Sequence, residues 1–365
     1  RNMTSFARTR ILTFLVASSL ALGGCVTAEE PEVVVEDIAV VEESAEDIAV
    51  VAGEDDYVIL YSGRKESLVQ PLIDVFMEQS GVQVDIRYAG TSELAAQILE
   101  EGSQSPAAVF LSQDAGALGA LGEAGLLDTL PEQISNRVDP AFTSSDGSWV
   151  GVTGRARVIV YDSENVAVED LPTDADDIVG PQWSGKVGVA PANASFQSFV
   201  TAYRVIRGET AADQWVSGLV INDPQIYEKN SAILEGVDSG EVPLGLINHY
   251  YWYRMESERG ADNMRAKLHF LPAGDPAAIV NVTGVGILEA QSRDLDALKL
   301  VEFLVSDQAQ QYFVSTTYEY PLVPGIASPE GLPALSELAS ADFDLSDLRT
   351  LADTQDLLRK YGLIF

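Results

Sequence analysis

The sequence predicts an α/β protein with two lobes, in which strands and helices alternate along most of the chain. Two alternating sets support this prediction, the first starting at residue 57 and the second at residue 186. Two apolar strands with no helix between them separate the sets. Because 46% of the residues are hydrophobic, the chain can form two ordinary cores.

The first set begins with a short apolar strand, a loop and an amphipathic helix. Alternating or continuous apolar runs indicate the further strands, and Thr91 and Ser92 are residue types that cap helices. This order favours a mostly parallel sheet covered on both faces. The expected strands lie at residues 57–61, 82–86 and 107–111, and the expected helices at residues 67–80 and 91–101.

The strands at residues 149–153 and 156–161 follow one another directly, so they can carry the chain from one lobe to the other. A return strand is expected at residues 280–288, and helical periodicity covers residues 295–314 and 345–361. The second set predicts strands at residues 186–190, 242–247 and 267–271 and helices at residues 195–207, 211–219 and 249–258.

Because the chain crosses and returns, we expect each lobe to combine separate stretches of sequence. The N-terminal lobe is expected to contain residues 57–155 and 281–330. The C-terminal lobe is expected to contain residues 156–280 and 331–365.

The first 25 residues are typical of an export signal. Arg8 and Arg10 precede an apolar run at residues 11–22, which is too short to span a bilayer as a mature helix. The run ends on two glycines before Cys25 and resembles the lipobox of bacterial lipoproteins, so we expect cleavage before Cys25 and acylation of its thiol. The alternative is a buried apolar helix with an incidental cysteine. Because Cys25 is the only cysteine, an internal disulfide and a thiolate metal cluster are both excluded.

Residues 26–56 are expected to form an acidic, disordered tether. Every charged residue between positions 29 and 56 is acidic, and the stretch contains no aromatic residue. The whole chain has a formal net charge of −34, which argues against nucleic acid as a partner. The acidity either favours a cationic ligand or only keeps an exported protein soluble.

The most informative segment is the run of aromatic residues that follows the strand at residues 242–247. Adjacent residues on a strand point in opposite directions, so Tyr250 and Tyr251 could not converge within a strand. The apolar run stops at Ile247, however, and Asn248 is a good helix cap, which places both tyrosines in a first helical turn. Ligands of open α/β sheets bind where strands end in this way.

Two neighbouring phenols suggest a strongly polarising cation as ligand. Phenolate is a hard oxygen donor with an ordinary pKa near 10, so a cation such as Fe(III) is needed to deprotonate two of them near neutral pH. Zinc would favour Cys or His, and calcium would favour a carboxylate loop, which the sequence lacks. An aromatic run can also be part of a core or a stacking platform for an organic ligand.

Six short motifs, in this order, resemble those of bacterial ferric-ion-binding proteins. The resemblance covers nearly the whole chain from Tyr57 and implies an α/β fold of the type II periplasmic binding protein class, with two lobes of mixed sheets joined by a hinge. The motifs are Tyr61-Ser62-Gly63-Arg64-Lys65-Glu66, Ser105-Pro106-Ala107-Ala108-Val109-Phe110, Gln113-Asp114-Ala115-Gly116-Ala117-Leu118, Gly154-Arg155-Ala156-Arg157-Val158, Pro191-Ala192-Asn193-Ala194-Ser195-Phe196 and Asn248-His249-Tyr250-Tyr251-Trp252.

The resemblance implies a binding protein rather than an enzyme. It implies an exported, lipid-anchored component of an ABC importer that delivers Fe(III) to a permease, and we expect a monomer. The paired tyrosines of the family match Tyr250 and Tyr251, which the resemblance assigns as iron ligands.

Three positions depart from the pattern of the family. Lys65 replaces a histidine ligand of some members, and Gln113 replaces a glutamate. Members with an additional tyrosine place it near Phe196, which cannot bind iron. With two firm protein ligands, the octahedral ion needs another donor, and the resemblance implies a synergistic carbonate or phosphate.

The positions that match the anion site of the family are Asn193, Ala194, Ser195, Asn230 and Asn248. Exposed amides at a helix N-terminus suit an anion without any basic side chain. The alternative is that the asparagines only cap helices. Lys65, Gln113 and Arg155 are expected to lie near the iron, where Lys65 and Arg155 can balance charge.

The remaining candidates are assigned to structure or left open. We expect His249 and His269 to be structural, whereas Tyr61 and Tyr227 either pack or lie near the ligands. The same fold can hold a polyamine, thiamine or an oxyanion instead of iron. An enzyme is disfavoured because the sequence contains no nucleophile elbow, HExxH motif or P-loop.

Overall fold

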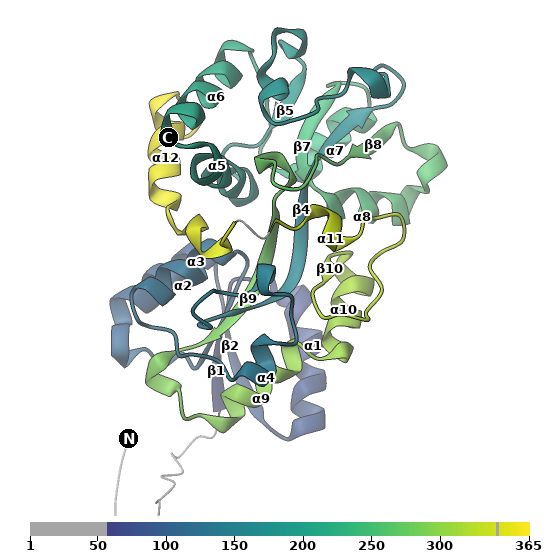
Figure 1. Cartoon of the computed structure of the whole chain (residues 1–365). Coiled ribbons are helices and arrows are strands. Elements are labelled where there is room, and N and C mark those ends of the chain that lie inside the picture. Colours follow the sequence, from purple (N-terminus) through teal and green to yellow (C-terminus); the bar gives the residue numbers. More distant parts are fainter. Residues whose placement is uncertain (1–56, 341–342) are drawn as a thin grey trace, which may run out of the picture. The chain divides into compact units, whose positions relative to one another are not determined.

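The computed structural model describes residues 57–340 and 343–365 (Figure 1). The predictions for the signal peptide at residues 1–25, for Cys25 and for the tether at residues 26–56 lie outside these residues. No helix in the described part of the chain is both long and apolar enough to cross a membrane.

The first sheet has the strand order β2-β1-β3-β9-β4, and β10 also pairs with β4. Strands β1, β2 and β3 are parallel, whereas β9 runs antiparallel to both β3 and β4. The helix pairs α2 with α3 and α1 with α10 lie on opposite sides of these strands (Figure 1). The bounds are β1 (Tyr57–Ser62), β2 (Gln83–Tyr88), β3 (Val109–Ser112), β4 (Val150–Asp162), β9 (Val280–Ile287), β10 (Tyr320–Pro321), α1 (Glu66–Ser80), α2 (Thr91–Glu101), α3 (Ala115–Glu123), α9 (Leu295–Leu304) and α10 (Asp307–Thr317).

The second sheet has the order β4-β7-β5-β6, and β8 also pairs with β4. Strand β7 is antiparallel to β4 and parallel to β5, so both sheets are mixed rather than mostly parallel. The bounds are β5 (Val187–Val189), β6 (Gln225–Ile226), β7 (Leu244–Asn248), β8 (Ala266–His269), α5 (Ala194–Arg207), α6 (Glu209–Ile221), α7 (Asn230–Asp238), α8 (His249–Arg259) and α12 (Leu351–Lys360).

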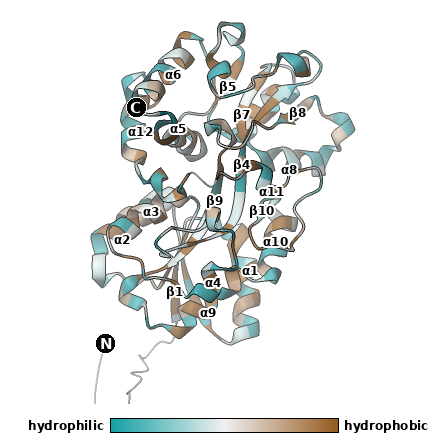
Figure 2. Ribbon diagram, in the orientation of Figure 1, coloured by the Kyte–Doolittle hydropathy of each residue, from teal (hydrophilic) through white to brown (hydrophobic). Residues whose placement is uncertain are grey.

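A single strand, β4, belongs to both sheets, so the prediction of two separate strands at residues 149–153 and 156–161 is wrong. Ala156 pairs with Val280 in the first sheet, and the next residue, Arg157, pairs with Asn248 in the second. Apolar residues dominate β1 and β7, whereas the middle of β4 is hydrophilic (Figure 2). All 13 residues of β4 are nevertheless buried, so its polar middle must face polar partners or a ligand.

Several element boundaries differ from the sequence prediction. Helix α2 starts at Thr91 and has Gly90 at its N-cap, so neither Thr91 nor Ser92 caps it. The helix expected at residues 295–314 is divided into α9 and α10, because Ser306 caps α10 by accepting the amide hydrogen of Ala309. The stretch at residues 345–361 is a short 3-10 helix (Leu345–Arg349) followed by α12.

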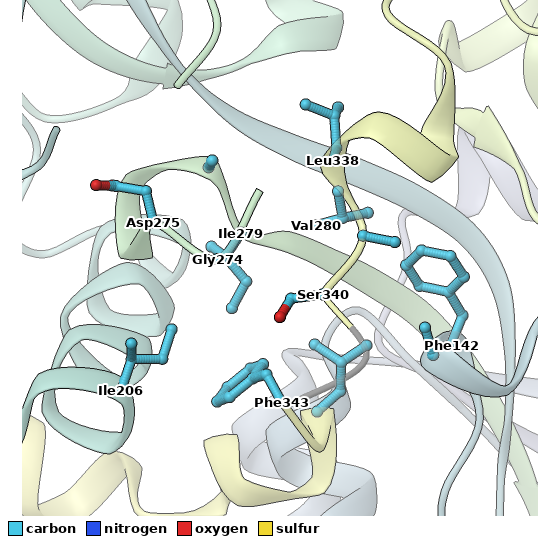
Figure 3. Close-up of a pocket in the computed structure, with 13 residues that line it drawn as sticks. Phe142, Ile206, Gly274, Asp275, Ile279, Val280, Leu338, Ser340 and Phe343 are labelled. Carbon is cyan, nitrogen blue, oxygen red and sulfur yellow. The ribbon is translucent and has the colours of Figure 1, made fainter. Parts of the chain in front are cut away.

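The C-terminal segment passes from one core to the other. Leu345 and Leu348 are buried in the larger hydrophobic cluster, and their 3-10 helix packs against α3, whereas Leu358 is buried in the other cluster, beside α5 and α6. Near this crossing, an apolar cavity of about 30 Å³ lies beside Phe343 and the start of β9 (Figure 3). The lobe boundaries remain a prediction, and the burial of Leu345 and Leu348 favours moving residues 345–349 to the first lobe.

Candidate functional site

A cavity of about 340 Å³ is lined by residues of both sheets. It lies where β3 and β7 end, beside the hydrophilic middle of β4. The N-terminal turns of α2, α5, α7 and α8 also contribute to its lining. Parallel strands and helix N-termini therefore present backbone amides and polar side chains to one space, as expected for a ligand site in an α/β protein.

Tyr250 and Tyr251 occupy the first turn of α8 and line this cavity together, as the sequence predicts. Their rings stack with centroids 4.4 Å apart and an interplanar angle of 27°. The guanidinium carbon of Arg254, one turn further along, lies 5.0 Å from the Tyr250 centroid and 5.9 Å from that of Tyr251. Burial, followed by the neighbouring Tyr251, raises the pKa of Tyr250 above its ordinary value. The unliganded phenol of Tyr250 is therefore protonated at neutral pH.

Asn248 stands at the N-cap of α8, but its side chain makes no capping hydrogen bond. The expectation that it caps the helix is wrong in this respect. Its Oδ1 instead accepts a hydrogen bond from Nη1 of Arg157 at 3.3 Å. The first amides of α8 consequently remain without a side-chain cap beside the two tyrosines.

Arg157 is the main residue of the site that sequence reasoning missed. Its Nη1 donates to Ser195 Oγ at 3.2 Å and to Asn230 Oδ1 at 3.4 Å, in addition to Asn248. The residue is only 3% exposed, and its Nε and Nη2 have no hydrogen-bond partner among the described residues. Burial lowers the pKa of Arg157 to about 9, which leaves the group cationic at neutral pH. A buried cation with two unmatched donors suits an anion.

The expected anion residues Asn193, Ala194, Ser195, Asn230 and Asn248 all line the cavity. Asn193 also caps α5, because its Oδ1 accepts the amide hydrogen of Ser195 at 3.0 Å. Asn230, which is 1% exposed, donates to Ser195 Oγ at 2.9 Å. Asn193 therefore caps a helix, as the alternative interpretation expected. The side chains of Asn230 and Asn248 instead accept hydrogen bonds from Arg157.

The three residues expected near the iron have different positions. Arg155 and Gln113 line the cavity, and Nη2 of Arg155 donates to the backbone carbonyl of Gln113. Lys65 is exposed at the start of α1 and does not line the cavity. Its neighbour Arg64 is buried instead and forms an ion pair with Glu319 at 2.5 Å.

His249 is structural, as expected. Its Nδ1 accepts the amide hydrogen of Ala156 at 3.0 Å, and its Nε2 lies 2.8 Å from the carbonyl oxygen of Tyr318. The proton must therefore be on Nε2, and burial lowers the pKa of His249 to about 4. The half-buried His269 similarly bonds to the carbonyl of Pro172. Both histidines join segments of the fold.

The remaining candidate aromatic residues lie outside the cavity lining. Tyr61 donates to Glu101 and Tyr227 donates to Glu241, so both phenols already have partners. Phe196 is fully buried in the second hydrophobic cluster. Within the described ranges, no group of three or more His, Cys, Asp or Glu residues could hold a metal ion. Two carboxylates, Glu93 and Asp114, do line the cavity.

Known proteins resemble this chain over most of its length. A family model described as bacterial extracellular solute-binding protein matches residues 104–343. The major ferric iron-binding protein of Neisseria meningitidis serogroup B is 33% identical over 310 residues, which are 84% of this chain and 93% of that protein. Iron-bound HitA from Pseudomonas aeruginosa has a TM-score of 0.76 and 32% identity over 84% of this chain and 99% of its own. The Trichodesmium protein solved with iron and citrate ligands has a TM-score of 0.72 and 28% identity, with the same coverage.

Two mixed α/β sheets that share one strand, with a cavity lined from both, are the architecture of a type II periplasmic binding protein, as expected. The chain belongs to the bacterial ferric iron-binding periplasmic protein family, whose members are non-enzymatic solute-binding proteins. The family and the fold class inferred from the sequence motifs are thereby confirmed.

Proposed function

We propose that this chain binds Fe(III) through Tyr250 and Tyr251 and delivers it to the permease of an ABC importer. The observation that carries the proposal is the stacked pair of phenols in a cavity that also contains a buried arginine with unmatched donors. One relative that is 33% identical is named for ferric iron binding, and HitA, which is 32% identical, was solved with iron bound, which supports the same cargo here.

The electrostatics of the cavity fit a phenolate-bound ferric ion. Burial holds Tyr250 protonated in the unliganded protein, so only a strongly polarising cation can displace its proton. Arg254 lies over both rings, and the positive charge of Arg155 opposes the effect of burial on the pKa of Tyr250, which favours its phenolate form. Iron binding is therefore expected to release protons.

A synergistic anion, carbonate or phosphate, is proposed to complete the coordination shell. Asn193, Ala194, Ser195, Asn230 and Asn248 line one side of the cavity. Nε and Nη2 of Arg157 provide unmatched donors at the same place. The citrate in the related iron complex supports an organic carboxylate as a further choice of anion.

An oxyanion without iron is the second candidate, because the same donors of Arg157 would suit it. Polyamines and thiamine are disfavoured by the two buried arginines, Arg155 and Arg157, which would repel a cationic organic ligand. Absorbance distinguishes iron from an oxyanion, since phenolate-to-iron charge transfer tints a protein and an oxyanion does not.

Export and anchoring are also proposed. The signal at residues 1–25 and the acidic stretch at residues 26–56 support a lipoprotein held at a membrane by acylated Cys25. Incorporation of a labelled fatty acid would test this anchor. The label should be absent from the Cys25→Ser variant, and equal labelling of both forms would refute the anchor.

The ligand assignment is tested by Tyr250→Phe combined with Tyr251→Phe. The double variant should lose the visible charge-transfer band and at least about a hundredfold of iron affinity, because two charged ligands are removed with little loss of volume. Absorbance during a titration with freshly dissolved ferric chloride and phosphate measures both. Tyr61→Phe is the matched control, since Tyr61 lies outside the cavity lining and bonds to Glu101. Unchanged affinity in the double variant would refute the assignment.

A further inference from the structure

The wall of the cavity that the first sheet provides contains donors that the proposed ferric site does not use. It is formed by the first turn of α2, by Gln113 after β3 and by Arg155 on β4. The first-sheet wall of the cavity therefore consists of Thr91, Ser92, Gln113 and Arg155.

The N-terminus of α2 is open toward the cavity. Gly90 occupies the N-cap and has no side chain that could accept the first amide hydrogens. The first hydrogen bond of the helix joins the amide of Leu94 to the carbonyl of Gly90 at 2.9 Å. The amides of Thr91 and Ser92 therefore have no acceptor in the described part of the chain. An 11-residue helix with free amides at its positive end attracts an anion.

Two contacts fix the position of Thr91. Its Oγ1 accepts the amide hydrogen of Gln113 at 2.9 Å, so its hydroxyl hydrogen is left to donate elsewhere. Gly63 packs directly beneath it, because a Cβ at position 63 would lie only 1.9 Å from Thr91 Oγ1. The glycine of the Ser-Gly-Arg motif thus lets the start of α2 approach β1 and β3.

Arg155 adds an independent indication of an anion. It is 5% exposed, and its Nε has no hydrogen-bond partner within residues 57–340 and 343–365. Its Nη2 donates to the carbonyl of Gln113, the residue whose amide bonds to Thr91. A buried cation with an unmatched donor is therefore linked through Gln113 to the first residue of α2.

The two cavity arginines are held on different walls. Arg155 and Arg157 are two residues apart on β4, so they share a face and their Cα atoms are about 7 Å apart. Arg155 is tied to Gln113 of the first sheet, whereas Arg157 is tied to Asn230 and Ser195 of the second. An anion that is bound only by Arg157 and its partners leaves the donors of Arg155 and of the first turn of α2 without an acceptor.

We propose that the first turn of α2 and Arg155 form a second anion subsite, separate from the one at Arg157, which takes a carboxylate or phosphate group. The subsite extends the proposed ferric site, on which its biological role rests. One ligand with two anionic groups, or two separate anions, would connect both walls around the metal. This favours a polyanionic ferric complex as cargo over the bare ion with a single small anion.

Two carboxylates near the subsite affect its strength. Asp114 is engaged as the cap of α3, where its Oδ1 accepts the amide hydrogen of Ala117 at 3.1 Å. Glu93, in the first turn of α2, is exposed and lines the cavity, so its charge opposes a bound anion. Replacing Glu93 with glutamine should therefore tighten anion binding.

The test uses the iron-free full chain titrated with inorganic phosphate in a calorimeter. We expect two phosphate ions per chain. Arg155→Gln should weaken one of the two sites by about tenfold or more and leave the other unchanged, because a charge-assisted hydrogen bond is lost at one wall. Glu93→Gln should strengthen the same site by about two- to fivefold.

A single phosphate per chain, or two that are unaffected by Arg155→Gln, would overturn the second subsite. Circular dichroism checks the fold of each variant. If Arg155→Gln does not fold, Glu93→Gln tests the proposal alone, and an unchanged phosphate affinity of the Glu93→Gln variant would then refute the subsite. Because this titration contains no iron, its failure is distinct from failure of the ferric assignment. Absence of the charge-transfer band in the unaltered, iron-loaded protein would refute only the latter.

Discussion

At the scale of single residues, the junction between β7 and α8 explains why two adjacent tyrosines can act together. The apolar run of β7 ends before Asn248, and helical geometry then turns Tyr250 and Tyr251 toward one cavity. This arrangement could be predicted because the change from apolar to polar residues is local. The absence of a capping hydrogen bond from the Asn248 side chain could not be predicted. That side chain bonds instead to Arg157, which is 91 positions away in the sequence.

His249 provides a residue-scale prediction. Replacing it with phenylalanine removes the partner of both the Ala156 amide and the Tyr318 carbonyl, so the free energy of unfolding should fall by about 2–5 kcal/mol. Urea unfolding measures this change. His269→Phe is the matched control and should cost less than about 2 kcal/mol, since that half-buried residue makes one such bond. Equal costs for the two variants would contradict the bridging role of His249.

At the scale of elements, β4 determines most of what sequence reasoning missed. The sequence prediction placed Gly154 and Arg155 between two strands, whereas β4 continues through both and its two arginines line the cavity. Continuity places Arg155 and Arg157 on one face, which a break would not. The lobe to which the residues beyond 331 belong was also hard to predict. Packing, rather than helical periodicity, determines the core in which Leu345 and Leu348 are buried.

The buried ion pair between Arg64 and Glu319 connects four elements of the first sheet. Arg64 follows β1, Glu319 precedes β10, and their partners Thr153 and Thr283 lie on β4 and β9. Burial alone would raise the pKa of Glu319. The charge and hydrogen bond of Arg64, together with the charge of Arg155 and the hydrogen bond from Thr153, outweigh burial and lower the pKa to about 2. The native carboxylate therefore holds its proton far less tightly than the unfolded one does.

This difference predicts a pH dependence. Because the native pKa lies below the unfolded value, the stabilisation is fully present above about pH 5 and is lost as the pH falls toward 2. Glu319 should account for about 3 kcal/mol of this loss, and Glu319→Gln should remove that contribution while lowering stability at pH 7 by about 3–5 kcal/mol. Urea unfolding between pH 7 and pH 2.5 measures both, and identical pH slopes in the two proteins would contradict the role of the pair.

At the scale of the whole molecule, the chain brings polar residues from two sheets to one cavity while each sheet keeps its own helices. The composition and the alternation of strands with helices were sufficient to predict the α/β class. The six motifs, in their order along the chain, were sufficient to predict the family. The partners of the cavity residues could not be predicted, because contacts such as Arg157 with Asn230 join residues that only the fold brings together.

Iron affinity should depend on both pH and anion. Burial raises the pKa of Tyr250, so protons compete with the metal, and affinity should fall by up to about tenfold per pH unit for each phenol that must ionise. Removing carbonate and phosphate should weaken binding further, because Arg157 then lacks an anionic partner. Titrations followed by absorbance at pH 8, 7 and 6, with and without phosphate, measure both effects. Affinity that is independent of pH and anion would contradict the coordination scheme.

The central claim is that the phenolate oxygens of Tyr250 and Tyr251 hold the ferric ion. Diffraction from crystals of the iron-loaded protein at the iron absorption edge tests it most directly. The account predicts one strong anomalous peak in the cavity, at about 2 Å from both tyrosine Oη atoms, as for oxygen ligands of a small, highly charged ion. A peak elsewhere in the protein, or tyrosine oxygens that point away from it, would contradict the claim.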